Sequence, residues 1–130
     1  MDNKKRLTAS HIRYLIKLYQ LSSDGVGVKN VDLAKALGFS KPSVHNMLKY
    51  LSEMDYVEQQ SYGLAHLTCN GRKVAQKYAF CFELLKDRIS ELCGDAFSAE
   101  NAVCTLLAEL GENRTDELYR SGDASRVSIT

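Results

Sequence analysis

The sequence predicts a mainly α-helical protein, with a winged helix-turn-helix module followed by a further helical region. Two short amphipathic segments, about residues 30–37 and 40–51, are separated by a turn that contains Gly38. A longer amphipathic segment precedes them, and two extended stretches joined through Gly63 follow, which is typical of a β-hairpin. The order helix, helix, helix, hairpin is more specific than any one of its parts, and it predicts the winged fold.

The first helix is expected to begin after Thr8, which is a favourable N-cap residue. His11 occupies the third helical position, where a capping box normally has Glu or Gln. The following apolar residues recur at helical spacing and define one broad buried face: Ile12, Leu15, Ile16, Leu18, Tyr19 and Leu21.

The two helices of the helix-turn-helix have clear start and stop residues. Asn30 is the expected cap of the first, and Gly38 is expected to end it in a left-handed conformation. Ser40 is the expected cap of the second, with Pro42 in the first turn, where its missing N–H has no helical partner to lose. The second of these helices is the candidate recognition helix.

Beyond the hairpin, Thr68 is expected to cap a helix that continues to about Leu92, longer than a small wing module needs. Further helices are expected at about residues 98–110 and 115–120. We therefore predict a DNA-binding domain at residues 1–67, a helical dimerisation region at 68–120 and a mobile tail at 121–130. The helical region is too small to form a hydrophobic core of its own, which favours a homodimer.

Composition narrows the class of protein. Apolar residues make up 45% and charged residues 25% of the chain, which are ordinary values for a globular domain. No apolar run approaches a membrane span and no leader pattern is found, so we expect a cytoplasmic protein without a membrane partner. The four cysteines include no C-x-x-C pair and are expected to be reduced and mostly buried: Cys69, Cys81, Cys93 and Cys104.

The charge is divided unevenly along the chain. Residues 1–78 hold 12 Lys and Arg against 6 Asp and Glu, whereas residues 79–130 hold 5 against 10. A basic first half suits a polyanion such as double-stranded DNA, and an acidic second half does not.

Candidate DNA contacts are the polar residues of the recognition helix and the tip of the wing. Asn46 has the side chain that pairs with adenine, and Ser43 suits a base or a phosphate. Lys41, Lys49 and Tyr62 are better suited to the phosphate backbone. The complete set of candidates is Ser40, Lys41, Pro42, Ser43, His45, Asn46, Lys49 and Tyr62.

Residues 31–51, VDLAKALGFSKPSVHNMLKYL, resemble the iron- and manganese-dependent repressors, the diphtheria toxin repressor and manganese transport regulator (DtxR/MntR) family. The stretch from Leu67 to Ala75 also matches the L-T-x-x-G-x-x-x-A signature that follows the wing in that family, a signature shared with MarR-like repressors. The resemblance covers about residues 8–120. It implies a dimeric repressor whose DNA affinity rises when Fe²⁺ or Mn²⁺ binds between the first helix, the long helix and the next one.

The residues at the implied metal positions depart from that pattern. Arg13 and Ile16 stand where the first helix should provide ligands, and Phe82 stands where the long helix should provide a His. Of the E-x-x-E-H sequence in the following helix, residues 100–104 keep only the first Glu. We therefore expect the usual metal site to be absent, so that no cofactor is assigned. A rebuilt site for a divalent metal (Mn, Fe or Zn) remains an alternative, with Glu100, Cys104 and Cys81 as its candidate ligands.

The leading interpretation is a sequence-specific DNA-binding transcriptional regulator, a repressor by resemblance, that acts as a homodimer. Two alternatives stay open: a MarR-like regulator that responds to a small ligand or to thiol oxidation, and a winged-helix protein-interaction module without DNA binding. An enzyme is not expected, because His11, His45 and His66 lie in separate elements and no phosphate loop or nucleophile–base pair is present.

Overall fold

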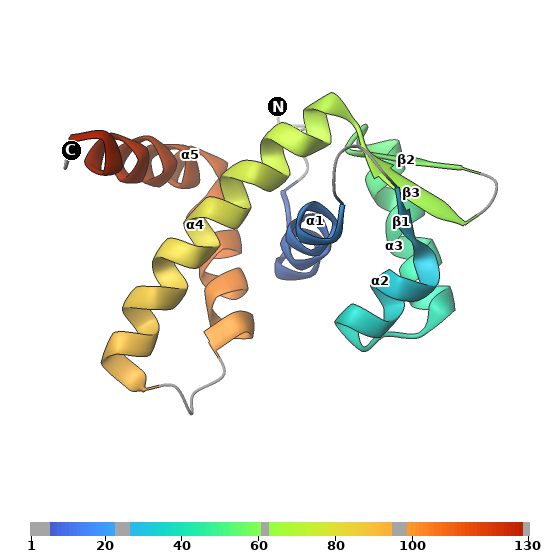
Figure 1. Cartoon of the computed structure of the whole chain (residues 1–130), viewed down its shortest axis with the longest axis horizontal. Helices are drawn as coiled ribbons and strands as arrows, with labels where there is room; N and C mark the ends of the chain where they lie inside the picture. Colours follow the sequence, from blue (N-terminus) through green and yellow to red (C-terminus); the bar gives the residue numbers. More distant parts are fainter. Residues whose placement is uncertain (1–5, 23–26, 61–62, 95–98, 129–130) are drawn as a thin grey trace. The chain divides into compact units, whose positions relative to one another are not determined.

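The computed structural model describes residues 6–22, 27–60, 63–94 and 99–128 (Figure 1). The chain divides into two compact units, one of residues 13–76 and one of residues 1–12 together with 77–130. The division falls inside two helices, so the units differ from the predicted split at residue 67.

The unit of residues 13–76 is a winged helix-turn-helix. It contains most of α1 (Ala9–Leu21), then β1 (Val28–Lys29), α2 (Asn30–Leu37), α3 (Lys41–Glu53), β2 (Val57–Gln59) and β3 (Leu64–Leu67). The strands form an antiparallel sheet in the order β1-β3-β2, with Val57 opposite Leu67 and Val28 opposite Ala65. Figure 1 shows the sheet beside α2 and α3. The predicted helices and hairpin are therefore confirmed.

Strand β1 was not predicted, because two residues are too few to show an alternating pattern. Its presence changes the start of α2. Lys29 is held in an extended conformation and is the N-cap, without a side-chain cap bond, and Asn30 is the first helical residue. The N–H of Asn30 donates to the carbonyl of Gly63 at 2.8 Å. The prediction that Asn30 caps α2 was therefore wrong, because pairing with β3 sets the helix start.

The turn between α2 and α3 has the expected caps. Gly38 has a φ of 75°, the left-handed conformation that glycine adopts most easily, and its N–H donates to the carbonyl of Ala34. Ser40 is extended, and its hydroxyl accepts a hydrogen bond from the N–H of Ser43, which starts α3. The core of this unit includes buried leucines and valines from all three helices and the sheet: Leu15, Leu18, Leu33, Leu37, Val44, Leu48, Leu51 and Val57.

The wing is joined to α4 (Cys69–Cys93) through one close backbone approach. The Thr68 hydroxyl donates to the carbonyl of Asp55 at 2.7 Å and accepts from the N–H of Gly71 at 2.9 Å. A Cβ atom built on Gly71 would lie 1.9 Å from the carbonyl oxygen of Tyr56. The L-T-x-x-G signature therefore has a physical basis: threonine ties the chain before β2 to the helix start, and glycine allows the two backbones to meet.

The second unit contains the rest of α4 and α5 (Ala99–Ser128). Gly111, with φ 81° and ψ 171°, breaks α5 into two halves, at the place where a turn was predicted. Figure 1 shows the second half turning away from the first and crossing α4. The helix continues to Ser128, beyond its predicted end at about Arg120. No helix in the described ranges is both long enough and apolar enough to cross a membrane.

Three contacts hold the second half of α5 against α4. The Lys77 ammonium lies 2.7 Å from the Asp116 carboxylate, and the Phe80 and Tyr119 rings meet edge to face at 5.3 Å. A Cβ atom on Gly122 would lie 2.8 Å from the ring of Phe80, so the helices approach closely there. This docking explains why the helix persists where the sequence alone has no helical periodicity.

The N-terminus of α1 has a capping box in which histidine replaces the usual acidic residue. The N–H of Thr8 donates to Nδ1 of His11 at 3.0 Å, and the N–H of His11 donates to the Thr8 hydroxyl at 3.3 Å. Because Nδ1 accepts a hydrogen bond, the box requires the neutral imidazole. Burial also lowers the pKa of His11 from its usual value.

This cap makes stability depend on pH. A histidine whose folded pKa is lowered stabilises the fold above its unfolded pKa, about 6.5. That contribution is lost as the pH falls through the folded pKa. We expect His11→Gln, which retains a capping-box acceptor, to lose less unfolding free energy between pH 7 and pH 5 than the parent, by about 1 kcal/mol. Urea unfolding at several pH values measures this difference, and parallel curves for the two proteins would contradict it.

Candidate nucleic-acid interface

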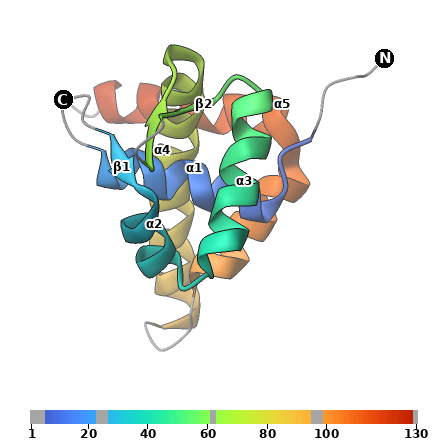
Figure 2. The same ribbon diagram turned by 90° about the vertical axis from the view of Figure 1, so that its right-hand side faces the viewer.

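One face of α3 is polar and exposed along its whole length. Val44, Leu48 and Leu51 face the core, whereas the predicted contact residues on this helix are all exposed: Lys41, Pro42, Ser43, His45, Asn46 and Lys49. In Figure 2 the ribbon is turned so that α2 and α3 face the viewer. The helix-turn-helix scaffold therefore presents Asn46 beside two lysines, which is a side-chain set that suits base edges and phosphates.

The two serines at the start of α3 have different roles. Ser40 is exposed, but its hydroxyl caps the helix and also donates to the Ser43 hydroxyl at 3.0 Å. Because the Ser43 oxygen accepts this bond, its own hydrogen points away from the cap and is available to an acceptor such as a phosphate. Ser40 is thus first a structural cap, and Ser43 is the better candidate contact. The remaining candidate, Tyr62, lies outside the described residues.

An aromatic contact anchors the turn before α3, and the sequence analysis did not identify it. Phe39 stacks on Tyr14 of α1 with ring centroids 5.9 Å apart and an interplanar angle of 24°. The Arg13 guanidinium lies over the same Phe39 ring, 5.6 Å from its centroid. These contacts tie the turn to α1 and so fix the position of the first residues of α3. The feature of the sequence that could have indicated this contact is Phe39 itself, a large apolar residue in a polar turn.

Comparison with known proteins shows what this module resembles. Residues 6–65 match the family described as the iron-dependent repressor N-terminal DNA-binding domain. These residues are thus similar to the DNA-binding domain of that repressor family. The match includes α1, the helix-turn-helix and the wing up to Ala65, which is the part that holds the candidate DNA contacts.

Relatives and solved structures extend the likeness. The transcriptional regulators MntR of Escherichia coli O6:H1 and O157:H7 are each 38% identical over 82 residues, covering 59% of this chain and 53% of theirs. The chain therefore spans about half the length of these relatives. T. acidophilum IdeR has a TM-score of 0.60 at 14% identity over 87% of this chain and 53% of its own. Lactococcus lactis ZitR has 0.58 at 19% identity over 99% and 79%, so both share the fold.

Glu100 is retained, but the other positions on α4 and α5 at which the family resemblance implies metal ligands carry apolar or thiol side chains in this chain. Phe82, Val103 and Cys104 stand there, and all three are buried. Phe82 and Val103 offer no oxygen or nitrogen donor, which Fe²⁺ and Mn²⁺ require. Within the ranges that the structure describes, no group of three or more His, Cys, Asp or Glu side chains is placed to hold a metal ion. The residues present do not fit the family's metal.

The thiol alternative also lacks a suitable geometry. Cys81 is fully buried, and its thiol donates to the carbonyl of Thr115 at 3.7 Å. Burial raises the pKa of Cys81 to about 11, against a smaller opposing effect of Lys77. A metal ligand or a redox-active cysteine must be a thiolate. Glu100, the third candidate ligand, is exposed. Cys81 is thus arranged as a core residue.

This arrangement predicts selective alkylation of the native protein. At pH 8 roughly a thousandth of Cys81 is thiolate, since its pKa is about 11, and the thiol is also buried. We expect iodoacetamide to label the exposed Cys69 and Cys93 quickly, and Cys81 and Cys104 only after denaturation. Mass spectrometry of the digested protein measures each site. Rapid native labelling of Cys81 would contradict the assignment of this thiol to the core.

Proposed function

We propose that this chain is a sequence-specific DNA-binding transcriptional regulator that acts as a homodimeric repressor. The observation that carries the proposal is the exposed face of α3, with Ser43, Asn46 and Lys49, on a domain similar to the DNA-binding domain of the iron-dependent repressor family. The basic first half of the chain supports DNA as the partner, since phosphate contacts provide most of the affinity of such modules. The recognition helix reads base edges in the major groove, and the wing adds backbone contacts.

The proposed regulator binds DNA without the family's metal. Phe82, Val103 and Cys104 occupy all but one of the implied ligand positions on α4 and α5, and the remaining ligand, Glu100, is exposed. The Lys77–Asp116 ion pair and the Thr115 contacts hold these helices together without an ion. Thr115 also donates from its hydroxyl to the carbonyl of Gly111 at 2.8 Å. Direct packing of these helices therefore takes the place of a metal bridge.

Selection of bound fragments from genomic DNA tests two proposals, that the chain binds a specific DNA sequence and that it does so without the family's metal. The selection is run with a chelator, and in parallel with added Mn²⁺, Fe²⁺ or Zn²⁺. Enrichment of one palindromic site under all conditions is the expected result. Enrichment only with metal would overturn the metal-free mechanism, and absence of enrichment under every condition would favour a protein-interaction module.

The proposed homodimer would form through the helical region. Leu92 is 85% exposed and Leu106 38% exposed, so α4 and α5 have apolar side chains that a second copy of the chain would cover. Two copies of the module would match the two half-sites of a palindrome. Light scattering at several concentrations measures the assembly. We expect a dimer for the parent and a monomer for Leu106→Glu, while Leu21→Glu, at a similarly exposed position on α1, is the matched control.

Removal of the Phe39 ring is expected to lower the affinity for DNA without removing any contact to a DNA phosphate. We expect Phe39→Ala to weaken binding to the selected site by about two- to tenfold, since a stacked aromatic pair contributes about 0.5–1.5 kcal/mol. The slope of affinity against salt should stay unchanged, because no phosphate contact is removed. Fluorescence anisotropy at several salt concentrations measures both quantities. Val31→Ala, which removes a similarly exposed apolar side chain of the same motif, should bind like the parent.

A further inference from the structure

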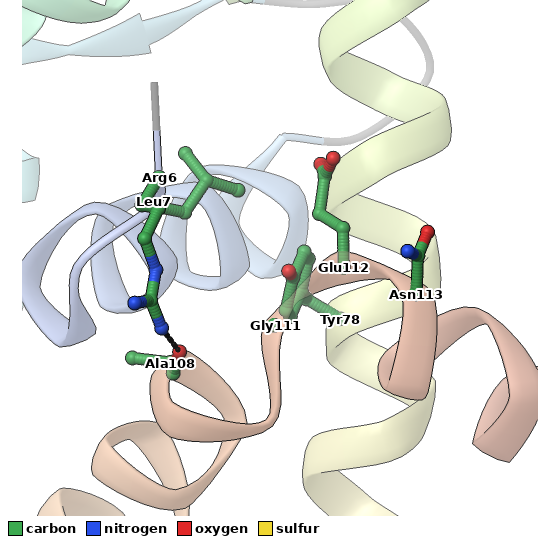
Figure 3. Close-up of a pocket in the computed structure, with 7 residues that line it drawn as sticks. All are labelled: Arg6, Leu7, Tyr78, Ala108, Gly111, Glu112 and Asn113. Carbon is green, nitrogen blue, oxygen red and sulfur yellow. Dashed lines mark hydrogen bonds between the residues drawn. The ribbon is translucent and has the colours of Figure 1, made fainter. Parts of the chain in front are cut away.

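A cavity of about 240 Å³ lies in the unit formed by residues 1–12 and 77–130. Its walls come from the segment before α1, the middle of α4 and the kink of α5 (Figure 3). Leu7 and Tyr78, both buried, and Ala108 give it an apolar surface. A cavity of 150 Å³ holds a benzene molecule, so this one has room for a ligand of roughly ten non-hydrogen atoms.

Charged side chains of opposite sign line the same cavity. Arg6 donates one hydrogen bond, to the carbonyl of Ala108 at 3.1 Å, and its guanidinium carries five N–H donors. Glu112 is half-buried, and Asn113 adds an amide next to it. Among the residues that the structure describes, neither Glu112 nor Asn113 has a side-chain hydrogen bond or ion pair. Figure 3 shows the Arg6 and Glu112 side chains coming from different elements.

The half-buried Glu112 carboxylate lacks a partner among the described residues, which is unfavourable, so a cation that pairs with it gains the corresponding free energy. Arg6 is exposed and offers its remaining N–H donors to a carboxylate. A ligand with only a carboxylate would pair with Arg6 and leave Glu112 unpaired. A ligand with only an ammonium group would do the reverse. A ligand with both charges and a small apolar body satisfies both residues and fits the surface of Leu7 and Tyr78.

We propose that this cavity is a binding site for a free α-amino acid. The Arg6 guanidinium receives the carboxylate of the ligand in a paired hydrogen bond, and the Glu112 carboxylate receives its ammonium group. The Asn113 amide contacts a polar side chain of the ligand, and the apolar surface contacts its carbon atoms. The volume excludes the largest aromatic side chains. This inference does not depend on DNA binding, because the site lies on the protein alone.

Thermal-shift screening of the full chain against each proteinogenic L-amino acid, followed by calorimetry, tests the proposal. We expect at least one small amino acid to bind with a Kd below about 1 mM. The deaminated and decarboxylated analogues of that amino acid should bind roughly tenfold more weakly, because each loses one charge-assisted contact. Analogues that bind as well as the amino acid would overturn the assignment of a zwitterion. Absence of binding by every amino acid at 10 mM, about ten times the expected limit, would overturn the site itself.

Variants locate the binding in the cavity. Arg6→Gln and Glu112→Gln should each weaken binding by roughly tenfold, for the same reason as the analogues. Arg114→Gln and Glu117→Gln remove the same charges from exposed α5 residues that do not line the cavity, and they should bind like the parent. Equal binding by all four variants would place the ligand elsewhere and overturn the proposal. DNA affinity, measured separately, reports on the proposed function and not on this site.

Discussion

Gly71→Ala is expected to destabilise the winged module by about 3 kcal/mol, the upper range for overpacking a folded site. Glycine to alanine within a helix normally stabilises by up to about 1 kcal/mol, so the sign is opposite to that expected from helix propensity. The reason is the approach of Tyr56, whose carbonyl oxygen would lie 1.9 Å from the new Cβ atom. The obstacle is backbone and cannot rotate away as a side chain does.

Displacement of the Tyr56 backbone would also weaken the hydrogen bonds that join the wing to the start of α4. The same Tyr56 carbonyl accepts from the N–H of Thr68 at 3.0 Å, and the Thr68 hydroxyl connects the carbonyl of Asp55 to the N–H of Gly71. Asp55 itself has a φ of 67°, which is uncommon for a residue with a side chain, and the Thr68 bond holds it there. A shift at Gly71 therefore affects the turn that leads into the wing.

Chemical denaturation of the full chain measures this effect, with Gly27→Ala as the matched control. A Cβ atom on Gly27 would lie 2.9 Å from Nε2 of His66, a half-buried side chain that can move. We expect this control to change the free energy of unfolding by less than about 1 kcal/mol in either direction. If the two variants unfold at the same denaturant concentration, the close approach at Gly71 does not limit stability.

Asn46→Ala and Lys49→Ala are expected to weaken DNA binding in different ways. Asn46 has the amide that pairs with adenine, so its loss should cost about 1–3 kcal/mol at the specific site and leave binding to unrelated DNA nearly unchanged. Lys49 is expected to contact a phosphate. Its loss should weaken binding to all DNA sequences and reduce the slope of log affinity against log salt by about 0.9.

Anisotropy titrations with the selected site and with a scrambled duplex, at four salt concentrations, separate the two effects. Lys86→Ala is the matched control, because Lys86 belongs to the acidic second half and lies on α4 near Glu83. If Asn46→Ala weakens binding to both duplexes equally, Asn46 does not read a base. An unchanged salt slope for Lys49→Ala would remove the phosphate contact from the proposed interface.

Local sequence patterns predicted most of the winged module correctly. Gly38, Ser40 and Thr68 act at short range, on residues three or four positions away, so the sequence alone indicated where α2 ends and where α3 and α4 begin. Apolar spacing indicated which face of α3 is buried, and therefore which face is exposed to a partner. Residues 31–51 by themselves carry the resemblance to the repressor family.

Packing between distant segments determined the features of the structure that the sequence did not predict. Strand β1 exists only because β3 pairs with it, and Phe39 has an anchoring role only because α1 brings Tyr14 and Arg13 against it. The second half of α5 remains helical to Ser128, and its contacts with Lys77 and Phe80 on α4 stabilise it. The cavity beside Arg6 requires a segment and a helix kink more than 100 residues apart. Sequence by itself determined the local caps and the exposed face, because those depend on neighbours in the chain. Only the tertiary structure decided the contacts between distant segments, because no short-range pattern encodes which distant side chains meet.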